Sequence, residues 1–363
     1  MNKKIGLCYG GYCPMHQGHL DLIMKAKKEN DICVIVVCGY NNEPRAKELG
    51  MTLDERYSLI KKYFKDDEQI KVISVNDDDL GLDQSMCHNN WLIWVKHIRK
   101  KLKQYHICDI DYPITFYVAE KLYQEELESI GEHVQIYDKI NHVSGTEIRK
   151  NPYKYWHKIL KPFRQYMTYN ILVIGTASEG KSTLTRDIAT YFGIPYAEEY
   201  GRTYMVESGK IDDDLNALDF KKFIEKQVHL CWDAMKTTDS GIIISDTDMT
   251  VTLMYAKEYA KHSYYNITEN DYNQQIIPQA EYYKDKIKWD VIFFLTPAND
   301  FVDDGVRNMR QSSMEERMKN AEELKKLIQI YYGDNVPVIF LKGGDFLNNF
   351  ESVKTHINGV LTK

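Results

Sequence analysis

Apolar and polar positions alternate along this chain in blocks that predict strands and helices in regular succession. Short apolar, β-branched runs, typical of parallel strands covered on both faces, are separated by segments with apolar residues at helical spacing. This order predicts an α/β fold with right-handed crossovers and a doubly wound parallel sheet. In the first half the expected strands are 4–9, 31–40, 70–75 and 115–120, and the expected helices are 20–30, 52–64 and 90–106.

The pattern pauses before residue 170 and then restarts. Pro152 and Pro162 bracket a short aromatic-rich segment, which places the expected boundary near residue 166. We therefore expect two domains, 1–166 and 167–363, each with its own doubly wound parallel sheet. In the second half the expected strands are 170–176, 194–200, 241–248 and 291–297, and the expected helices begin at Lys181 or span 220–236 and 314–332.

The composition fits a two-domain protein that binds small anionic molecules. With 363 residues, 43% hydrophobic and 28% charged, the chain can fill two cores. The formal net charge of -6 gives no broad basic field for nucleic acid. No apolar run approaches the length of a membrane span, and no cleavable apolar segment begins the chain. We expect a cytoplasmic protein without nucleic-acid or membrane partners. The sequence leaves open whether the protein forms a homo-oligomer.

The segment GTASEGKST at 175–183 predicts a phosphate-binding loop between a strand and a helix. Its glycines allow backbone N–H groups to converge on phosphate oxygens, while Lys181 reaches the β- and γ-phosphates of ATP. The Ser182 hydroxyl is placed to bind Mg²⁺. The residues expected to bind ATP here are Gly175, Ser178, Glu179, Gly180, Lys181, Ser182 and Thr183.

A Mg²⁺-ATP site also needs acidic and cationic side chains. Asp246 and Asp248 follow the apolar run GIIIS at 241–245, and one of the two carboxylates, with Asp246 preferred, would hold the metal's water shell. The alternative for each is a helix N-cap. Glu199 lies at the end of the strand predicted at 194–200 and is a candidate to accept the proton of a substrate hydroxyl, with Asp246 or Asp248 as the alternative base. Arg307 and Arg310 are candidates to neutralise the moving phosphoryl group, the alternative being ordinary surface arginines.

A second phosphate site is predicted after the first strand, in GGYCPMHQGH at 10–19. The H-x-G-H pattern places two imidazoles beside a helix N-terminus, with a glycine that allows close approach of a phosphate. A metal site is the alternative, although the motif supplies only two nitrogen ligands. The residues expected to bind ATP at this site are Gly10, Tyr12, His16, Gly18 and His19.

This loop and VSGTEIR at 143–149 resemble the H-x-G-H and I-S-x-T-x-x-R motifs of the nucleotidyltransferase superfamily, with valine in the isoleucine position. The resemblance implies that His16 and His19 bind triphosphate oxygens and stabilise the charge that develops as a substrate phosphate attacks the α-phosphorus in line. This is electrostatic and positional catalysis, without a covalent enzyme intermediate. The residues that would complete the ATP site are Ser144, Thr146 and Arg149.

The order of the two modules resembles the NadR family, which pairs nicotinamide mononucleotide adenylyltransferase with ribosylnicotinamide kinase. The resemblance covers nearly all of the chain and implies an N-terminal Rossmann-like nucleotidyltransferase and a C-terminal P-loop kinase, both using Mg²⁺ and ATP. It places Glu199, Tyr200 and Arg202 in the nucleoside site. Its further marks are EEYGR at 198–202, SDTD at 245–248 and DDGVR at 303–307.

The same resemblance assigns a nicotinamide contact to Trp91, where the family has a tryptophan. An indole face can stack on a cationic pyridinium. Asn90 stands where the family usually has glycine, and the alternative is a core tryptophan packed with Trp94. Some members carry an N-terminal helix-turn-helix repressor module, which we do not expect in this chain.

These observations predict a bifunctional NAD salvage enzyme. The C-terminal domain would phosphorylate nicotinamide riboside with ATP, and the N-terminal domain would adenylylate the mononucleotide to NAD and pyrophosphate. Two alternatives stay open: a nucleotide- or NAD-sensing regulator with one active domain, and an N-terminal enzyme for another substrate, since H-x-G-H also serves pantetheine-phosphate and cytidylyl transferases.

Overall fold

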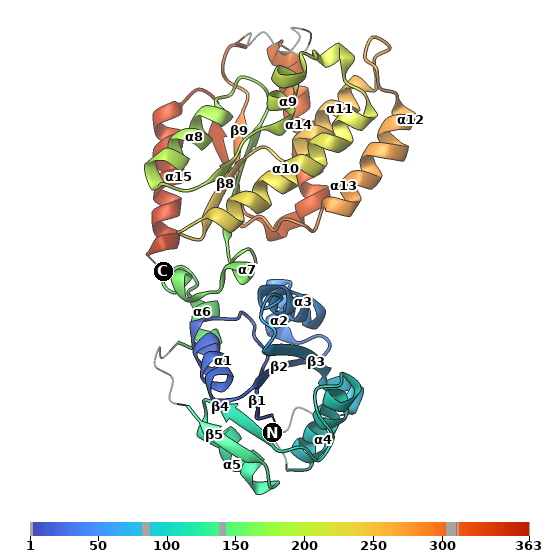
Figure 1. Cartoon of the computed structure of the whole chain (residues 1–363). Helices are drawn as coiled ribbons and strands as arrows, with labels where there is room; N and C mark the ends of the chain where they lie inside the picture. The colour runs from blue at the N-terminus through green and yellow to red at the C-terminus, as the bar shows by residue number, and fades with distance from the viewer. Residues whose placement is uncertain (1–2, 82–87, 138–142, 303–309, 311, 363) are drawn as a thin grey trace. The chain divides into compact units, whose positions relative to one another are not determined.

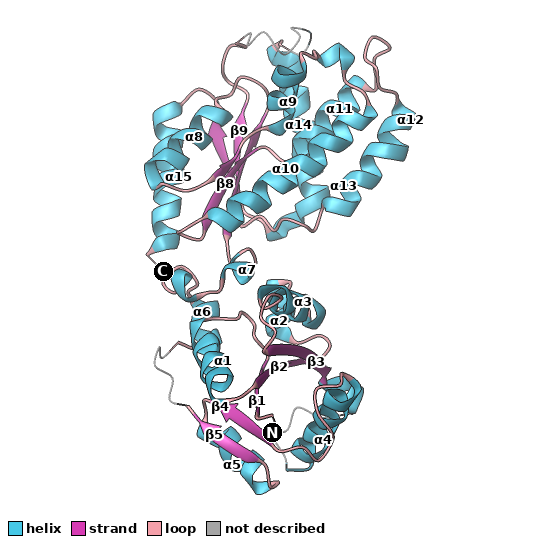
Figure 2. Ribbon diagram, viewed as in Figure 1, coloured by secondary structure: helices cyan, strands magenta, loops and turns pink. Residues whose placement is uncertain are grey.

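The computed structural model describes residues 3–81, 88–137, 143–302, 310 and 312–362, and the chain divides into two compact units, Met1–Met167 and Thr168–Lys363 (Figure 1). Each unit contains a five-stranded parallel sheet with helices on both faces (Figure 2). The predicted α/β class and doubly wound architecture are confirmed.

The first sheet has the strand order β3-β2-β1-β4-β5. Since β1 lies between β2 and β4, the winding direction reverses there, and ligands of open α/β sheets bind at the carboxyl ends of the strands at such a point. The elements of this unit are β1 (Ile5–Gly10), α1 (Gln17–Glu29), β2 (Ile32–Gly39), α2 (Pro44–Leu49), α3 (Leu53–Tyr63), β3 (Ile70–Asn76), η1 (Asp77–Leu80), α4 (His88–Gln104), β4 (Ile114–Val118), α5 (Lys121–Ser129), β5 (His133–Ile136), α6 (Gly145–Lys150), η2 (Trp156–Lys158) and α7 (Lys161–Arg164).

Alternate residues of β1 enter different cores of the first unit. Ile5 and Leu7 pack with Trp94 and Ile98 of α4, whereas Cys8 packs with Ile23 of α1 and its neighbours. Burial of both faces accounts for the nearly continuous apolar strands of the sequence. The carboxyl edge of the sheet therefore lies between helices that pack on its two faces.

The second sheet has the order β10-β9-β6-β8-β7, with β6 at its centre. The phosphate loop follows β6, and the carboxyl ends of β8 and β7 lie at the same edge because all these pairs are parallel. The elements are β6 (Tyr169–Gly175), α8 (Lys181–Phe192), β7 (Tyr196–Ala197), α9 (Tyr200–Ser208), η3 (Asp212–Asp214), α10 (Ala217–Thr237), β8 (Ile242–Asp246), α11 (Met249–Tyr259), α12 (Glu269–Asp271), η4 (Tyr272–Ile276), α13 (Ile277–Tyr283), β9 (Val291–Thr296), α14 (Met314–Tyr332), η6 (Gly333–Asn335), β10 (Val338–Lys342) and α15 (Phe346–Leu361).

Some elements differ from the sequence prediction. The predicted strand at 194–200 contains only a two-residue strand, because the backbone at Glu199 already begins α9. The outer strands β5 and β10 were not predicted, and most of their residues are half-buried or exposed, so they lack a continuous apolar run. In the described ranges no helix is both long and apolar enough to cross a membrane.

Candidate active sites

His16 and His19 lie together at the start of α1. His16 is the buried N-cap residue, and the two ring centroids are 3.8 Å apart. The backbone N–H of His16 donates to Nδ1 of His19 over 3.3 Å, and Tyr12 packs edge-on against the His19 ring. Because Nδ1 accepts this bond, Nε2 carries the proton of the neutral His19 ring. The turn thus orients His19 as a hydrogen-bond donor.

The second motif meets the H-x-G-H loop through Arg149. Its Nη1 donates to the Cys13 carbonyl over 2.6 Å, and its Nη2 donates to Oγ1 of Thr146 over 3.1 Å. A Cβ placed on Gly18 would lie 3.3 Å from the His16 ring and 3.6 Å from the Val143 carbonyl oxygen, so Gly18 lies where the His16 ring meets the second motif. The structure therefore brings the two distant motifs to one place.

Ser144 acts at this junction as the N-cap of α6. Its hydroxyl oxygen accepts from the Glu147 backbone N–H over 3.1 Å, and Glu147 Oε2 accepts from the Ser144 backbone N–H over 2.9 Å. This reciprocal capping box fixes the start of the helix. Gly10 ends β1 beside the Tyr12 ring, and a Cβ added to Gly10 would lie 3.5 Å from the Cζ atom of that ring.

A buried ion-pair cluster beside the loop was not predicted. Arg56 is fully buried and donates to the Gly11 carbonyl and, over 2.7 Å, to Oε2 of Glu43. Arg45 pairs with the same carboxylate. Burial, followed by the proximity of Arg45, lowers the pKa of Arg149. The guanidinium groups of Arg45 and Arg56 share the one carboxylate of Glu43, and the guanidinium group of Arg149 is close to them. This excess of positive charge favours a bound anion.

Trp91 lies in an aromatic cluster at the carboxyl end of β1. Its ring makes edge contacts with Tyr9, Trp94 and Tyr123, at centroid distances of 5.8, 5.6 and 6.0 Å. It is 6% exposed, and within the described residues its Nε1–H has no hydrogen-bond partner. Asn90 precedes it and is half-buried. Packing with Trp94 and a ligand contact are both compatible with this position.

The phosphate loop of the second unit is closed around Lys181. Gly175 has φ 151°, and a Cβ there would lie 2.5 Å from the Leu295 carbonyl oxygen; Gly180 has φ 88°. Both positions therefore require glycine. The buried Lys181 Nζ donates to the Thr176 carbonyl over 2.8 Å, so the loop closes back on its own lysine. Next to it on α8, Ser182 is half-buried and Thr183 exposed.

The side chains of Ser178 and Glu179 are engaged away from the loop centre. The Ser178 hydroxyl accepts from the Val302 backbone N–H over 3.1 Å. Glu179 is buried, with Oε1 2.7 Å from Arg317 Nη1, while Oε2 accepts from the Ala298 backbone N–H over 3.1 Å. These side chains shape the loop, so contacts of these two residues with ATP would use their backbone N–H groups.

The two predicted acids have different surroundings. Asp246 ends β8 in register with Val173 of β6, which places it beside the phosphate loop, and it is buried. Asp248 is the N-cap of α11: Oδ1 accepts from the Thr250 backbone N–H over 3.0 Å, and Oδ2 accepts from the Tyr332 hydroxyl. Burial raises the pKa of Asp248. Asp248 thus has the capping arrangement that the sequence left open.

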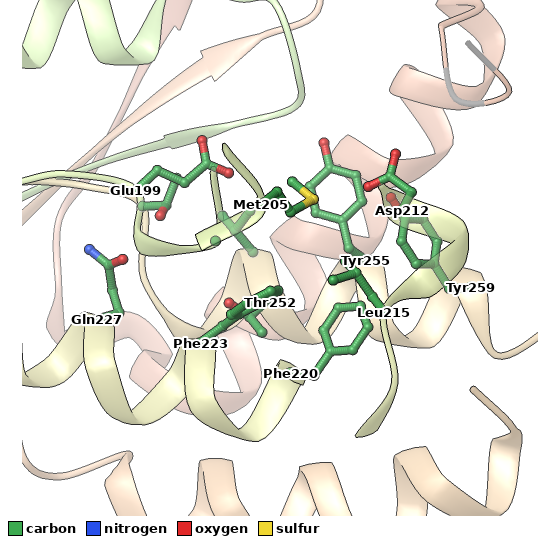
Figure 3. A pocket seen from close by; sticks show the side chains of 13 residues that line it. Glu199, Met205, Asp212, Leu215, Phe220, Phe223, Gln227, Thr252, Tyr255 and Tyr259 are labelled. Carbon is green, nitrogen blue, oxygen red and sulfur yellow. The ribbon is translucent and has the colours of Figure 1, made fainter. Parts of the chain in front are cut away.

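Glu199 lines a pocket between α9, α10 and α11 that is partly open to solvent (Figure 3). Gln227 of α10 fixes the backbone here: its Nε2 donates to the Glu198 carbonyl over 3.0 Å, and its Oε1 accepts from the Tyr200 backbone N–H over 3.0 Å. Gln227 was not predicted, although a glutamine on the apolar face of 220–236 is a detectable signal.

The remaining predicted residues are placed as follows. The centroid of the Tyr200 ring lies 6.3 Å from that of Phe223, which lines the pocket, and Arg202 is half-buried on α9. Arg310 is exposed, with Nη1 2.8 Å from Oδ1 of Asp213 and its guanidinium 4.4 Å from the centroid of the Tyr264 ring. Arg307 lies outside the described residues.

Two family models match the chain. Residues 7–151 match the model described as cytidylyltransferase-like, and residues 170–347 match the model described as an AAA domain. With the H-x-G-H site in the first unit and the phosphate loop beside a pocket in the second, the chain belongs to the class of bifunctional enzymes that join a nucleotidyltransferase to a P-loop kinase. Comparison with individual proteins then identifies the family.

The chain belongs to the NadR family, as the sequence resemblance predicted. It is 25% identical to the trifunctional NAD biosynthesis/regulator protein NadR of Salmonella typhimurium over 360 residues, which cover 96% of this chain and 81% of that protein. It is also 32% identical over 149 residues to the phosphopantetheine adenylyltransferase of Fusobacterium nucleatum, covering 40% of this chain and 82% of that enzyme.

Two solved structures of NadR proteins resemble the whole chain. A NadR protein in complex with NR superimposes with a TM-score of 0.82 at 28% identity, covering 100% of this chain and 97% of the other. A NadR protein in complex with NAD and AMP-PNP gives a TM-score of 0.79 at 28% identity, covering 98% and 96%.

Proposed function

We propose that this chain makes NAD from nicotinamide riboside in two ATP-dependent steps. The C-terminal unit transfers the γ-phosphoryl group of ATP to the riboside 5′-hydroxyl, and the N-terminal unit adenylylates the resulting mononucleotide. The observation that carries the proposal is the presence, in one chain, of a phosphate loop beside a pocket lined by Glu199 and a separate H-x-G-H site joined to Arg149. The NadR proteins solved with NR, and with NAD and AMP-PNP, support it.

In the kinase step the phosphate loop positions ATP. Lys181 and the backbone N–H groups around it bind the β- and γ-phosphates. The oxygen donors Ser182 and Asp246 suit Mg²⁺, which neutralises phosphate charge when bound. Glu199 lines the pocket and accepts the proton of the attacking hydroxyl, and Arg310 stabilises the transferring group after leaving Asp213.

In the adenylyl transfer step the mononucleotide phosphate attacks the α-phosphorus of ATP and pyrophosphate leaves. His16, His19 and Arg149 hold the triphosphate and stabilise the charge that develops on it. Arg45, which shares Glu43 with the buried Arg56, supplies a further cation for the acceptor phosphate. Because these donors are fixed by the fold, they require little reorganisation as the reaction proceeds.

Product analysis with two single variants tests the assignment of the two activities. Lys181→Ala should stop formation of the mononucleotide from riboside while leaving its conversion to NAD. His19→Ala should do the reverse, so that the mononucleotide accumulates. Each loss should be on the order of a hundredfold or more.

Three outcomes would contradict the proposal. Absence of pyrophosphate with mononucleotide and ATP would favour a regulator with one active domain. Turnover of phosphopantetheine in place of the mononucleotide would assign the N-terminal unit another substrate. Loss of both activities in each variant would show that the two sites are not chemically separate.

A further inference from the structure

The pocket lined by Glu199 lies on one side of the phosphate loop. Its lining also includes Asp212 and Thr247 (Figure 3). Thr247 follows β8, and its backbone N–H donates to the Val173 carbonyl of β6 over 2.9 Å. In the second sheet, β8 and β7 lie on one side of β6, and β9 and β10 lie on the other. The acceptor hydroxyl of the proposed kinase reaction therefore approaches from the β8 side of the loop.

This placement indicates where the phosphoryl donor lies. In phosphoryl transfer the attacking oxygen, the transferred phosphorus and the leaving oxygen are roughly in line. Because the attacking hydroxyl comes from the β8 side, the leaving ADP is expected on the opposite side of the transferred group. The adenine of ATP is then expected beside the residues that follow β9 and β10.

The segment that follows β10 packs closely on the phosphate loop. A Cβ added to Gly343 would collide with the Glu179 carboxylate, and a Cβ added to Gly344, which has φ 76°, would collide with the Asn299 side chain. Asn299 Nδ2 donates in turn to the Ser178 carbonyl over 3.3 Å. The two glycines thus allow the chain to reach the loop before α15 begins.

Phe346, the first residue of α15, lies with the edge of its ring against this loop. Its Cε1 atom is 2.7 Å from the position that a Cβ of Gly180 would occupy. The buried Asn349 fixes the first turn of the helix, because its Nδ2 donates to the Lys342 carbonyl over 2.7 Å. Phe346 is still 52% exposed. A ring that is held in place, with open surface beside a phosphate-binding loop, is preorganised to stack on a nucleobase.

We infer that Phe346 binds the adenine of ATP and so positions the phosphoryl donor of the kinase step. The inference rests on the proposed kinase function and adds a contact for the base to the phosphate contacts of the loop. Stacking on an aromatic side chain uses the π-face of the base. Phe346 therefore contributes affinity for the nucleoside part of ATP and not for its phosphates.

The test separates the base of ATP from its phosphates. Kinase activity of the full chain is measured with nicotinamide riboside, and AMP-PNP and inorganic tripolyphosphate are compared as inhibitors that compete with ATP. Phe346→Ala should raise KM for ATP and Ki for AMP-PNP by about tenfold. It should leave Ki for tripolyphosphate and KM for the riboside unchanged. Phe346→Tyr keeps an aromatic ring and should restore most of the affinity for ATP.

Leu347→Ala is the matched control, since Leu347 is the next residue of α15 and is 72% exposed. It should change none of these constants. An unchanged KM for ATP in Phe346→Ala would overturn the inference. So would an equal loss of affinity for AMP-PNP and for tripolyphosphate, which would show that the ring only shapes the loop around Gly180.

Absence of riboside phosphorylation by the wild-type chain would contradict the proposed kinase function alone. The role of Phe346 is then decided by the binding of AMP-PNP that Lys181→Ala abolishes, measured by calorimetry on the full chain. Weaker binding of AMP-PNP to Phe346→Ala, with unchanged binding of tripolyphosphate, would support the adenine contact. Equal binding of AMP-PNP to Phe346→Ala and to the wild-type chain would overturn it.

Discussion

Glu179 of the phosphate loop and Arg317 of α14 form a buried ion pair, with Oε1 2.7 Å from Nη1 and both side chains at most 3% exposed. Arg317 also donates to the Asn299 carbonyl, and Glu179 accepts from the Ala298 backbone N–H. Each charge is therefore solvated by protein groups instead of water. The pair fixes the loop against the segment that follows β9.

Glu179→Ala should destabilise the C-terminal unit by about 3 to 5 kcal/mol, because it leaves the Arg317 charge buried without its partner. The same change should raise KM for ATP in the kinase reaction while leaving adenylyl transfer unchanged. Replacing both residues by Met should recover most of the stability. Urea unfolding and kinase kinetics measure these effects.

The exposed pair Glu315 and Lys319 on the same helix provides the control. Glu315→Ala should not change the unfolding free energy measurably, since solvent screens such a pair. If Glu179→Ala were as mild as Glu315→Ala, the buried pair would have no role in fixing the loop.

Gln227→Leu should lower the kinase kcat by about tenfold to a hundredfold, because a small shift of Glu199 would misplace the proposed catalytic base. The change removes the hydrogen bonds to the Glu198 carbonyl and the Tyr200 N–H while keeping a side chain of similar size. Lys226→Leu, on the exposed face of the same helix, controls for the substitution. An unchanged kcat in Gln227→Leu would rule out this positioning role.

The sequence predicted the parts of the sites that are contiguous in the chain. The loop at 175–183 and the H-x-G-H motif are local, because their spacing alone places donors at a helix start. The cluster of Glu43, Arg45 and Arg56 depends on contacts between α2, α3 and the loop after β1, which no spacing rule reveals. Asp212 lies in a run of three aspartates that looks solvated, and only the fold buries the first of them.

The sequence also predicted some strands of the two sheets and missed others. The central strands are visible in the sequence as apolar runs because both of their faces are covered. The edge strands β5 and β10 are partly exposed and short, so pairing with a neighbour and not composition defines them.

Trp91→Phe should raise KM for the mononucleotide in adenylyl transfer by about fivefold to tenfold if the buried Nε1–H binds the substrate. Phenylalanine keeps most of the aromatic packing, so the change separates a ligand contact from a core role better than alanine does. Tyr123→Phe, which alters another ring of the cluster, should leave KM unchanged. A loss of thermal stability in Trp91→Phe with an unaltered KM would favour the purely structural role.

Asp77 should make the stability of the N-terminal unit depend on pH. It follows β3 in η1, where burial raises its pKa from 3.8 to about 6, while a hydrogen bond from Trp94 acts in the opposite direction. The folded state therefore binds the proton more tightly than the unfolded chain. The stabilisation from this group is fully present below about pH 4 and is lost as pH rises through about 6.

Asp77→Asn stays uncharged at every pH, so its unfolding free energy should exceed that of the wild-type chain at about pH 8 and match it at about pH 4. The expected gain is about 1 kcal/mol, because solvent screens a half-buried group. Urea unfolding of both proteins across this range measures the difference. Asp79→Asn, at an exposed position in the same turn, should follow the wild-type profile. Parallel profiles for Asp77→Asn and the wild-type chain would show that Asp77 is ionised as readily in the folded state as in the unfolded one.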